Sequence, residues 1–333
     1  MTAAARSRRA HPPPTPRPVA LDTDPGIDDA LALMLAFRSP ELHVELITTV
    51  AGNVPVQVAT ANARRVLAML APSAWPVVAQ GAGYPLRRPP HTATAFHGDD
   101  GLGGVTALHH ADGSPYYPLP EQPAARRQAV QRLLQLVQHH GRDLTLIALG
   151  PLTNVARAIQ LSPTTMQQLG RLVIMGGAIG VPGNVSPVAE FNIFVDPHAA
   201  DVVLRAHLPI TLVPLDVTRQ VRLTRDFLQH ASQGAGTGLV QVTHHLTQQW
   251  LHSQAEGMAM HDPLTVAVTI DPSLVTLTSL PVCVETRGPH TIGMTVADRR
   301  SPAYWSHDMP RLEVALEVDA PRVLELFAAR VLT

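Results

Sequence analysis

Short apolar segments alternate with helical segments along most of this chain, and that alternation restricts its possible folds most strongly. Apolar segments predict strands at 19–21, 42–50, 76–80, 144–149, 172–175 and 210–213. The segments between them predict helices at 28–37, 56–70, 124–140, 152–160 and 196–206. Such alternation favours a mostly parallel sheet with helices on both faces. We therefore expect one doubly wound α/β domain over residues 19–333, with its ligand site at the carboxyl ends of the strands.

The second half of the chain continues the pattern with more helix. Residues 222–255 look mostly helical with a break near 233–238, and residues 263–270 predict a further helix. Strands are expected at 275–284, 291–296 and 312–318. Residues 81–120 are rich in Gly, Pro, His and Asp and are too long for an ordinary connection, which is typical of a functional lid or a disordered loop.

The composition excludes several classes of function. The 333 residues carry 25 basic and 26 acidic side chains, so the chain lacks the basic character of a protein that binds nucleic acid or an anionic membrane. It contains no lysine, which excludes the lysine-dependent phosphate loop and Schiff-base catalysis. Cys283 is the only cysteine, so an intrachain disulfide and a thiolate zinc cluster are excluded as well.

Residues 1–18 differ from the rest of the chain. They contain Arg6, Arg8 and Arg9, followed by prolines rather than by the apolar stretch of a signal peptide. Elsewhere no apolar run approaches the ~20 residues that span a bilayer. We interpret residues 1–18 as a flexible tail and expect a cytoplasmic protein.

The turn after the first predicted strand is unusually acidic. Asp22, Asp24, Asp28 and Asp29 lie within a stretch of eight residues. Carboxylates this close repel one another unless a cation or shared protons compensate, and hard divalent cations prefer oxygen ligands. Adjacent helical residues point about 100° apart, so Asp28 and Asp29 can face different ligands. Since a helix cap uses a single Asp, we predict a metal and substrate site here.

Three later turns also follow predicted strands. Asn53 follows Gly52 after the second strand, and Leu149 precedes a Gly-Pro turn and offers a carbonyl oxygen to a cation. Met175 leads through two glycines to a loop that contains Asn184. This loop does not start a helix, which excludes a dinucleotide-binding loop. Each turn, taken alone, is equally compatible with an ordinary connection.

Two further segments carry candidate polar groups. Glu190 and Asn192 are two residues apart, so an extended chain over 189–195 would point both to one side, and Phe191 to the other, as suits a polyol ligand. A solvent-wetted edge strand is the alternative. His261 precedes Asp262 and Pro263. An Asp at the N-cap followed by Pro is a common helix start, so Asp262 needs no functional explanation at this point.

Two kinds of position are informative among the other histidines. His97 lies in the long loop and could face a substrate from a lid. The adjacent pairs at 109–110, 139–140 and 244–245 lack the spacing of metal ligands, and we predict that they lie on the surface.

Taken in order, these motifs resemble the inosine-uridine preferring nucleoside hydrolases. The family's Asp-x-Asp-Pro-Gly-x-Asp-Asp signature corresponds to residues 22–29, and its Gly-Asn to residues 52–53. Its Gly-Pro-Leu-Thr-Asn, Met-Gly-Gly, Glu-Phe-Asn and His-Asp motifs correspond to residues 150–154, 175–177, 190–192 and 261–262. The resemblance spans about residues 19–330. The first motif is highly specific, and the others gain specificity from their order.

The resemblance implies a calcium ion at the bottom of the pocket and a nucleoside above it. It implies that the ion is bound by Asp24, Asp29, Asp262 and the Leu149 carbonyl, with Asp22 supporting these ligands. It implies substrate contacts from Asp28, Asn53, Met175, Asn184, Glu190, Phe191 and Asn192. The tyrosine that several members place on the helix before His-Asp is missing, and Gln249 or Trp250 is the candidate replacement toward the base.

The implied reaction hydrolyses the N-glycosidic bond of a ribonucleoside through an oxocarbenium-like transition state, releasing ribose and a free base. Asp24 would take a proton from a water on the metal. The departing base needs a proton or a hydrogen bond, for which His261 is the first candidate and His97 the second. Such an activity serves purine and pyrimidine salvage. The family's members are commonly oligomers, so a homodimer or homotetramer is expected.

Two alternatives remain. A haloacid-dehalogenase-like phosphatase also begins with Asp-x-Asp after a strand, but such enzymes carry Thr or Val where Gly26 stands here, and a later lysine. A catalytically silent nucleoside-binding protein would lack a base or a metal ligand, whereas Asp24, Asp29 and Asp262 are all present.

Overall fold

The computed structural model describes residues 15–234, 236, 238–254, 256–300 and 309–333. The predicted tail therefore lies outside the described residues as far as residue 14. The first strand, β1, spans Arg17–Thr23, so the folded domain begins slightly earlier than expected. The reason is backbone pairing, because Arg17 lies opposite Leu42 of the neighbouring strand.

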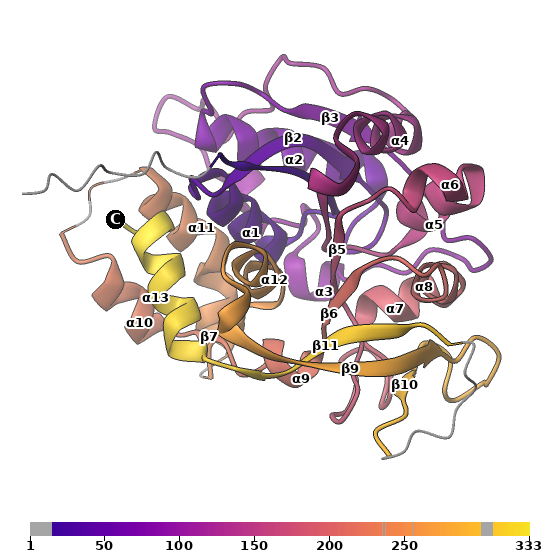
Figure 1. Ribbon diagram of the computed structural model, residues 1–333. Coiled ribbons are helices and arrows are strands. Elements are labelled where there is room, and N and C mark those ends of the chain that lie inside the picture. The colour runs from indigo at the N-terminus through magenta and orange to yellow at the C-terminus, as the bar shows by residue number, and fades with distance from the viewer. Residues whose placement is uncertain (1–14, 235, 237, 255, 301–308) are drawn as a thin grey trace, which may run out of the picture.

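A nine-stranded sheet forms the centre of the molecule (Figure 1). Its strands lie in the order β10-β9-β11-β6-β5-β4-β1-β2-β3. The strands from β11 to β3 run parallel to one another, whereas β9 and β10 are antiparallel additions at one edge. The remaining strands of the sheet are β2 (Leu42–Thr49), β3 (Val77–Gln80), β4 (Thr145–Ala148), β5 (Arg171–Met175), β6 (Ile210–Val213), β9 (Val275–Val284), β10 (Thr295–Ala297) and β11 (Arg311–Val318).

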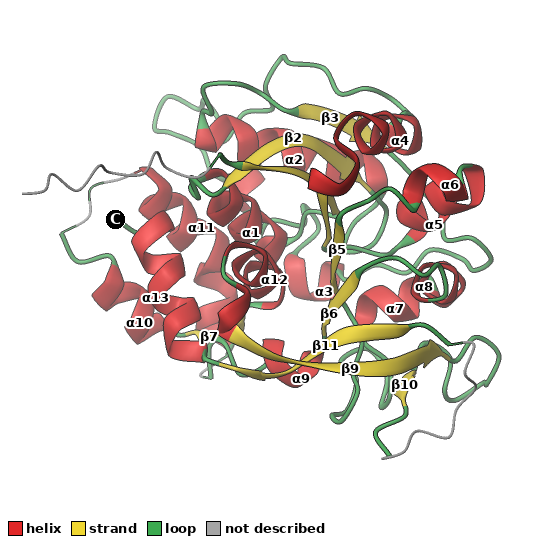
Figure 2. Ribbon diagram, viewed as in Figure 1, coloured by secondary structure: helices red, strands yellow, loops and turns green. Residues whose placement is uncertain are grey.

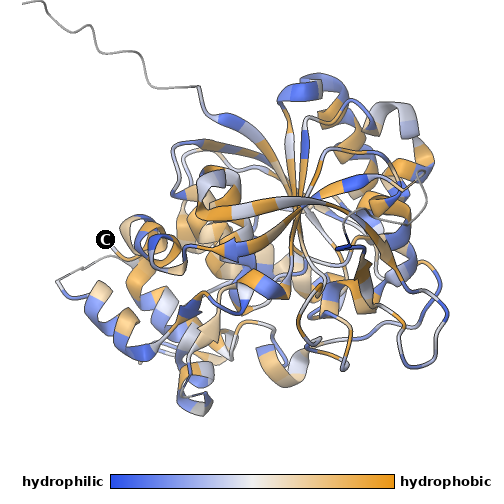
Figure 3. Ribbon diagram, turned by 60° about the horizontal axis from the view of Figure 1, so that its bottom comes forward, coloured by the Kyte–Doolittle hydropathy of each residue, from blue (hydrophilic) through white to orange (hydrophobic). Residues whose placement is uncertain are grey.

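Helices cover both faces of this sheet, as Figure 2 shows. One face carries α1 (Ile27–Phe37), α2 (Val56–Leu70), α11 (Gly238–Ser253), α12 (His261–Ile270) and α13 (Ala320–Val331). The other carries α4 (Ala129–His140), α5 (Thr153–Leu161) and α8 (Pro197–Leu204). Along β1 the side chains alternate between two cores, since Val19 and Leu21 join the first and Ala20 the second. Hydrophobic residues accordingly follow the central strands in Figure 3. The predicted doubly wound α/β fold is confirmed.

The order of the strands reverses between β1 and β4. The chain first builds outward from β1 through β2 to β3, and then returns to the other side of β1 with β4, β5 and β6. Asp22 of β1 lies opposite Ala148 of β4 in the register of this pair. In open α/β sheets, ligands bind outside the carboxyl ends of the strands at such a reversal. The acidic turn after β1 lies at this position.

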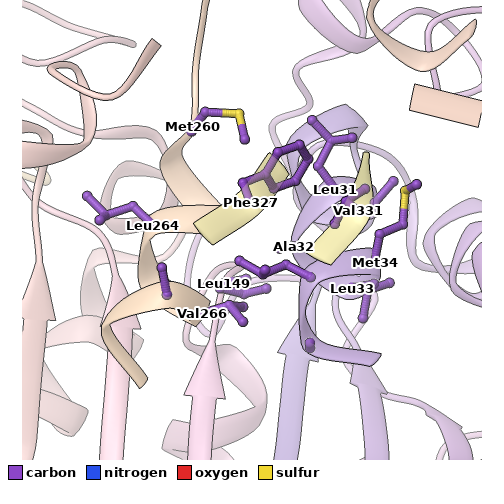
Figure 4. Packing of buried hydrophobic residues seen from close by; sticks show 14 of the residues in the cluster. Leu31, Ala32, Leu33, Met34, Leu149, Met260, Leu264, Val266, Phe327 and Val331 are labelled. Carbon is purple, nitrogen blue, oxygen red and sulfur yellow. The ribbon is translucent and has the colours of Figure 1, made fainter. Parts of the chain in front are cut away.

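Helix α1 holds the acidic turn in place. Every residue from Ile27 to Ala36 is buried, including Asp28 and Asp29 in the first turn. Figure 4 shows Leu31 to Met34 packed among side chains of α12 and α13, including Leu264 and Phe327, with Leu149 below. Burial of one such side chain contributes about 1.5–3 kcal/mol. The packing of α1 therefore fixes the orientation of the carboxylates at its amino end.

The segment over 189–195 is not extended as predicted. It forms the short helix α7 (Phe191–Val195), with Glu190 as its N-cap. The Glu190 carboxylate accepts hydrogen bonds from the backbone N–H groups of Asn192 and Ile193, and this capping turns the chain into a helix. Spacing by two residues therefore did not decide the conformation here.

Other elements differ in smaller ways. The helix expected from residue 124 begins at Ala129, and residues 222–255 divide into β7 (Arg222–Leu223), α10 (Arg225–Ala231) and α11. Strand β7 pairs with β8 (Met258–Ala259) in a separate small sheet. The short helices α6 (Pro163–Met166) and α9 (Leu215–Thr218) and the C-terminal α13 were not anticipated. None of the helices in the described part of the chain has the length and apolar character that crossing a membrane requires.

The long loop over 81–120 has internal structure. It contains α3 (Thr94–His97) and a 3-10 turn at Val105–Ala107. The Asp100 carboxylate accepts backbone N–H groups of Leu102, Gly104 and Thr106, at 2.9–3.0 Å, and the Thr106 hydroxyl at 2.9 Å. These bonds lower the pKa of Asp100, although its partial burial opposes them. The buried Asn62 of α2 then ties the loop to the acidic turn, because its amide donates to the carbonyls of Pro25 and Asp100.

Candidate active site

A cavity of about 440 Å³ opens at the carboxyl ends of the parallel strands. Most of the predicted site residues line it, namely Asp28, Asn53, His97, Leu149, Met175, Asn184, Glu190, Phe191, Asn192, Trp250, His261 and Asp262. Asp24 and Asp29 lie beneath the floor and are fully buried, whereas Asp28 is 9% exposed. The structure thus places Asp28 toward the cavity and the other two acids below it.

Asp24 is held between two glycines. Its Oδ2 accepts the backbone N–H of Asn53 at 2.6 Å, while its Oδ1 has no hydrogen-bond partner among the described residues. A Cβ atom on Gly52 would lie 2.0 Å from Oδ2, and one on Gly150 would lie 2.4 Å from Oδ1. Both turns therefore need glycine, because their backbones approach the carboxylate itself.

Asp29 is fixed by several donors from its own turn. Its carboxylate accepts the Thr23 hydroxyl, the backbone N–H of Gly26 at 2.9 Å and the side-chain amide of Asn53 at 3.0 Å. Burial and the neighbouring Asp28 raise the pKa of Asp29, whereas the hydrogen bonds from Thr23 and Gly26 lower it. Asn53 therefore connects the Asp24 and Asp29 carboxylates, one through its backbone and the other through its side chain.

Asp22 lies behind these acids and is bound by polar side chains from neighbouring elements. Its Oδ1 accepts the Thr48 hydroxyl from β2 and the Asn154 amide from α5, the latter at 2.8 Å. Asn154 also binds the Thr49 carbonyl and the Ala82 backbone N–H. Burial raises the pKa of Asp22 to about 6. The sequence motif predicts only a turn at Asn154, and nothing local marks this residue as a support for Asp22.

The acids form a group that fits a hard cation. Asp28, Asp29 and Asp262 each bring one carboxylate oxygen within 4.8 Å of the others. One buried oxygen of each of Asp24, Asp28 and Asp262 lacks a partner among the described residues. Burial raises the pKa of all four carboxyls, and the neighbouring carboxylates add to this effect at Asp24 and Asp262. Buried acids with unpaired oxygens are the donors that a divalent ion requires.

Asp262 is not the helix cap that its sequence suggests. The N-cap of α12 is Met260, and Asp262 lies within the first turn, 2% exposed. Its side chain therefore makes no capping hydrogen bond and is free to join the carboxylate group from a position more than two hundred residues after Asp29.

Glu190 and Asn192 also line the cavity. Glu190 accepts the backbone N–H of Gly177 at 3.1 Å as well as those at the start of α7, and burial raises its pKa to about 7. The Asn192 amide donates to the carbonyl oxygens of Leu149 at 2.6 Å and Met175 at 3.3 Å. A carbonyl oxygen has a second lone pair, so the bond from Asn192 leaves Leu149 one position for a cation.

Two histidines face the cavity from different elements. His97 accepts the backbone N–H of Ile27 on its Nδ1 at 3.1 Å, so the neutral ring carries its proton on Nε2. His261 contacts the Thr218 hydroxyl through its Nδ1 at 2.7 Å. Burial lowers the pKa of each imidazole to about 4, so both rings are neutral near pH 7. Neutral imidazoles donate hydrogen bonds without bringing a full charge into the cavity.

Aromatic side chains form the outer part of the cavity. Phe96 of α3 and Trp250 of α11 both line it, with ring centroids 5.9 Å apart. His91, also from the long loop, lines the cavity and lies 6.1 Å from the Phe191 ring. The composition of this loop is typical of a functional lid, but its sequence indicates only His97 as a site residue. Large apolar rings at the mouth suit a planar, partly apolar group.

Gln249 does not share this position with Trp250. It is exposed and is not part of the cavity wall, and its amide lies beside the backbone of Gly104. Adjacent residues on a helix point about 100° apart, which explains why only one of the two reaches the cavity. Among the paired histidines, His140, His244 and His245 are half-buried rather than on the surface. His140 binds Glu45 at 3.0 Å, and His245 binds Tyr117 at 2.7 Å.

Comparison with known proteins places this geometry in a family. The family model described as inosine-uridine preferring nucleoside hydrolase matches residues 19–325. The non-specific ribonucleoside hydrolase RihC of Escherichia coli is 42% identical over 284 residues, which cover 84% of this chain and 88% of the relative. RihC of Salmonella enteritidis PT4 is 40% identical over 316 residues, covering 93% and 97%.

Solved structures agree with the sequence relatives. A plant nucleoside hydrolase, the PpNRh1 enzyme, superposes with a TM-score of 0.85 at 32% identity and covers 96% of this chain and 99% of its own. A purine-preferring ribonucleoside hydrolase from Gardnerella vaginalis superposes with a TM-score of 0.84 at 31% identity, covering 95% and 98%. This chain therefore belongs to the inosine-uridine preferring nucleoside hydrolase family, and it is an N-ribosyl hydrolase that acts on ribonucleosides.

Proposed function

We propose that this chain hydrolyses the N-glycosidic bond of ribonucleosides with Ca²⁺ as its cofactor and Asp24 as its general base. The observation that supports this most directly is the group of buried carboxylates beneath the cavity, each of Asp24, Asp28 and Asp262 with one unpaired oxygen. In this proposal the ion is bound by Asp24, Asp29, Asp262 and the Leu149 carbonyl, and Asp22 holds the group from behind.

The donor set favours calcium over magnesium. Every donor is an oxygen atom, several are carboxylates, and one is a backbone carbonyl. Ca²⁺ accepts six to eight such ligands in irregular geometry, whereas Mg²⁺ retains most of its water. When bound, the ion supplies positive charge and lowers the pKa of a coordinated water.

Asp24 is suited to act as the base. Its Oδ2 is fixed by the backbone N–H of Asn53, and Gly52 and Gly150 restrict its movement. The other oxygen, Oδ1, is unpaired and accepts the proton of the attacking water in this proposal. Because the carboxylate is preorganised, little of its freedom is lost when the reaction begins.

The polar wall of the cavity suits the ribose. Its lining includes the polar side chains of Asp28, Asn53, Asn184, Glu190 and Asn192. We propose that these groups bind the ribose hydroxyls. Their carboxylate and amide oxygens then stabilise the positive charge that develops on the sugar as the bond breaks. The Phe191 and Met175 side chains supply apolar contact with the ring.

The departing base takes the aromatic end of the cavity. His261 and His97 are the proposed hydrogen-bond donors to it, and Trp250 with Phe96 is the proposed stacking surface. The relatives named above are described as non-specific in one case and purine-preferring in another, so the preference of this chain is to be measured rather than assigned.

Reducing-sugar release from inosine, uridine, cytidine and adenosine, with and without a calcium chelator, tests the proposal. We expect release that the chelator abolishes and that added Ca²⁺ restores better than Mg²⁺. Cleavage of a phosphate ester without nucleoside cleavage would instead favour the phosphatase alternative. Nucleoside binding without any turnover would indicate the silent binding protein.

Variants separate the base from the fold. Asp24→Ala is expected to abolish turnover and leave the melting temperature measurable, whereas Asp112→Ala, which changes an exposed acid in the long loop, is the matched control with full activity. Near-normal turnover by Asp24→Ala would remove Asp24 as base and ligand. We also propose that the protein is a cytoplasmic homodimer or homotetramer that serves nucleoside salvage. Sedimentation analysis by ultracentrifugation measures the number of subunits directly.

A further inference from the structure

Helix α9 places a buried hydroxyl beside His261. This short helix, Leu215–Thr218, follows β6 at the carboxyl edge of the sheet, and Thr218 is fully buried at its end. The Thr218 Oγ1 lies 2.7 Å from the Nδ1 atom of His261, although the two residues are 43 positions apart in the sequence. Thr218 does not line the cavity, so it reaches the substrate only through the histidine.

The direction of this hydrogen bond follows from the acceptors available to Thr218. Threonines in helices of this chain commonly donate to the carbonyl four residues earlier, as do Thr60, Thr243, Thr247, Thr265 and Thr269. For Thr218 that carbonyl belongs to Pro214, which accepts backbone N–H groups of Val217 and Thr218. The Thr218 hydroxyl makes no such bond to the Pro214 carbonyl, and its hydrogen-bond partner among the described residues is the Nδ1 atom of His261.

The opposite direction would leave a polar hydrogen unsatisfied. If the Nδ1 of His261 carried the proton, it would donate to Thr218, and the hydroxyl hydrogen would then be buried without an acceptor in the described surroundings. A buried donor without a partner is unfavourable, whereas an unused lone pair on a hydroxyl oxygen costs little. Donation by Thr218 therefore leaves the neutral imidazole with its proton on Nε2.

We propose that Thr218 is a positioning residue that fixes the ring orientation and the tautomer of His261, so that Nε2–H donates a hydrogen bond to the departing base. This inference rests on the proposed function, in which His261 contacts the base. No covalent step is added: the bond between the ribose and the base breaks, its electron pair goes to the base nitrogen, and the Nε2–H group stabilises that developing charge.

Two substrates with different leaving groups test this role. Inosine needs help for the departure of its base, whereas p-nitrophenyl β-D-ribofuranoside releases a stable anion that needs none. Thr218→Val keeps the shape of the side chain and removes its hydroxyl. We expect the variant to lose about 10-fold in kcat on inosine and less than about 2-fold on the p-nitrophenyl riboside. Thr218→Ser, which retains the hydroxyl, should restore most of the inosine rate.

A matched control and a double variant exclude a general packing effect. Thr265→Val removes a hydroxyl that donates to the backbone carbonyl of His261 at 3.2 Å rather than to its ring, and it should leave the ratio of the two rates unchanged. In a His261→Ala background, Thr218→Val should cause no further loss on inosine, because its effect passes through the ring. If Thr218→Val does not fold, Thr218→Ala and Thr218→Ser are compared in its place.

The outcomes distinguish this inference from the proposed function. Equal losses on both substrates, a full inosine rate in Thr218→Val, or a further loss in the His261→Ala background would each overturn the role of Thr218. Failure of the unmodified enzyme to cleave inosine or any other nucleoside would overturn the proposed function instead.

Discussion

Replacement of Gly52 by alanine tests the claim that two glycines hold the proposed base in place. The added Cβ would lie 2.0 Å from Asp24 Oδ2 and 2.8 Å from the Pro151 ring. Since such atoms essentially never approach closer than 3.0 Å, the carboxylate must shift by about 1 Å. It has little room, because Gly150 closes its other side.

The expected loss follows from this displacement. A misplacement of about 1 Å in a catalytic group costs on the order of 10²-fold in rate, and we expect kcat on inosine to fall by that factor. The shifted carboxylate also loses its 2.6 Å bond from the Asn53 backbone, so Ca²⁺ affinity should fall as well. Overpacking of a buried site costs about 1–3 kcal/mol in the free energy of unfolding, which leaves the variant folded.

The assay is steady-state hydrolysis of inosine at saturating Ca²⁺, with Ca²⁺ titration and thermal denaturation on the same samples. Gly83→Ala is the matched control, because its Cβ would meet only the Val56 side chain at 3.3 Å. We expect this control to keep the kcat and the Ca²⁺ affinity of the unmodified enzyme. A Gly52→Ala variant with near-normal kcat would show that Asp24 tolerates movement, and the reasoning would then be wrong.

Three further predictions concern metal-dependent stability, the base site and the core. Without Ca²⁺, the Asp22 carboxyl has a pKa of about 6 in the folded state and of 3.8 in the unfolded state. As the pH rises from 3.8 to 6, the free energy of unfolding should therefore fall by about 3 kcal/mol. Urea denaturation in chelator measures this fall against the Asp22→Asn variant, and a stability that rises with pH relative to that variant would contradict the prediction. Trp250→Ala should raise the KM for nucleosides about 10-fold, because the cavity loses a lining ring. The control, Gln248→Ala, changes an exposed side chain and should leave the KM unchanged, and an unchanged KM in Trp250→Ala would remove Trp250 from the base site. Phe327→Ala should lower the free energy of unfolding by about 3–5 kcal/mol and leave kcat unchanged, with Leu161→Ala, which changes an exposed side chain, as the control. A loss below about 1 kcal/mol would contradict the packing shown in Figure 4.

Local sequence patterns predicted the fold well where the residues of a single strand or helix are enough to identify it. The apolar segments that became β1 to β6 alternate with helices in the sequence, and the bounds of α2 and β6 agree with those expected. The segment at Glu190 failed because its conformation depends on a side chain that caps a helix, and spacing by two residues fits a helix start as well as a strand. The secondary-structure preferences of residues do not predict which backbone N–H groups a carboxylate will bind.

The site shows the same division. The four acids after β1 are close in the sequence, so their repulsion and their need for a cation could be inferred directly. Asp262 looked like a routine helix cap, and only the order of motifs assigned it to the metal. Thr218 and Asn154 had no distinguishing signal, because Thr and Asn are common and their partners lie 43 and 132 residues away. Tertiary contact, not local chemistry, gives these two residues their role.

The burial of α1 on all sides also has a consequence for the synthesis of the protein. Much of its cover comes from α12 and α13, which span His261–Ile270 and Ala320–Val331 and are therefore synthesised more than two hundred residues after α1. Until then, the face of α1 that α12 and α13 cover stays open to water and to other chains, a condition that favours aggregation or chaperone binding. Asp262 lies on α12, so it is made together with one part of this cover. Translation that stops before α12 yields neither the complete carboxylate group nor a closed core.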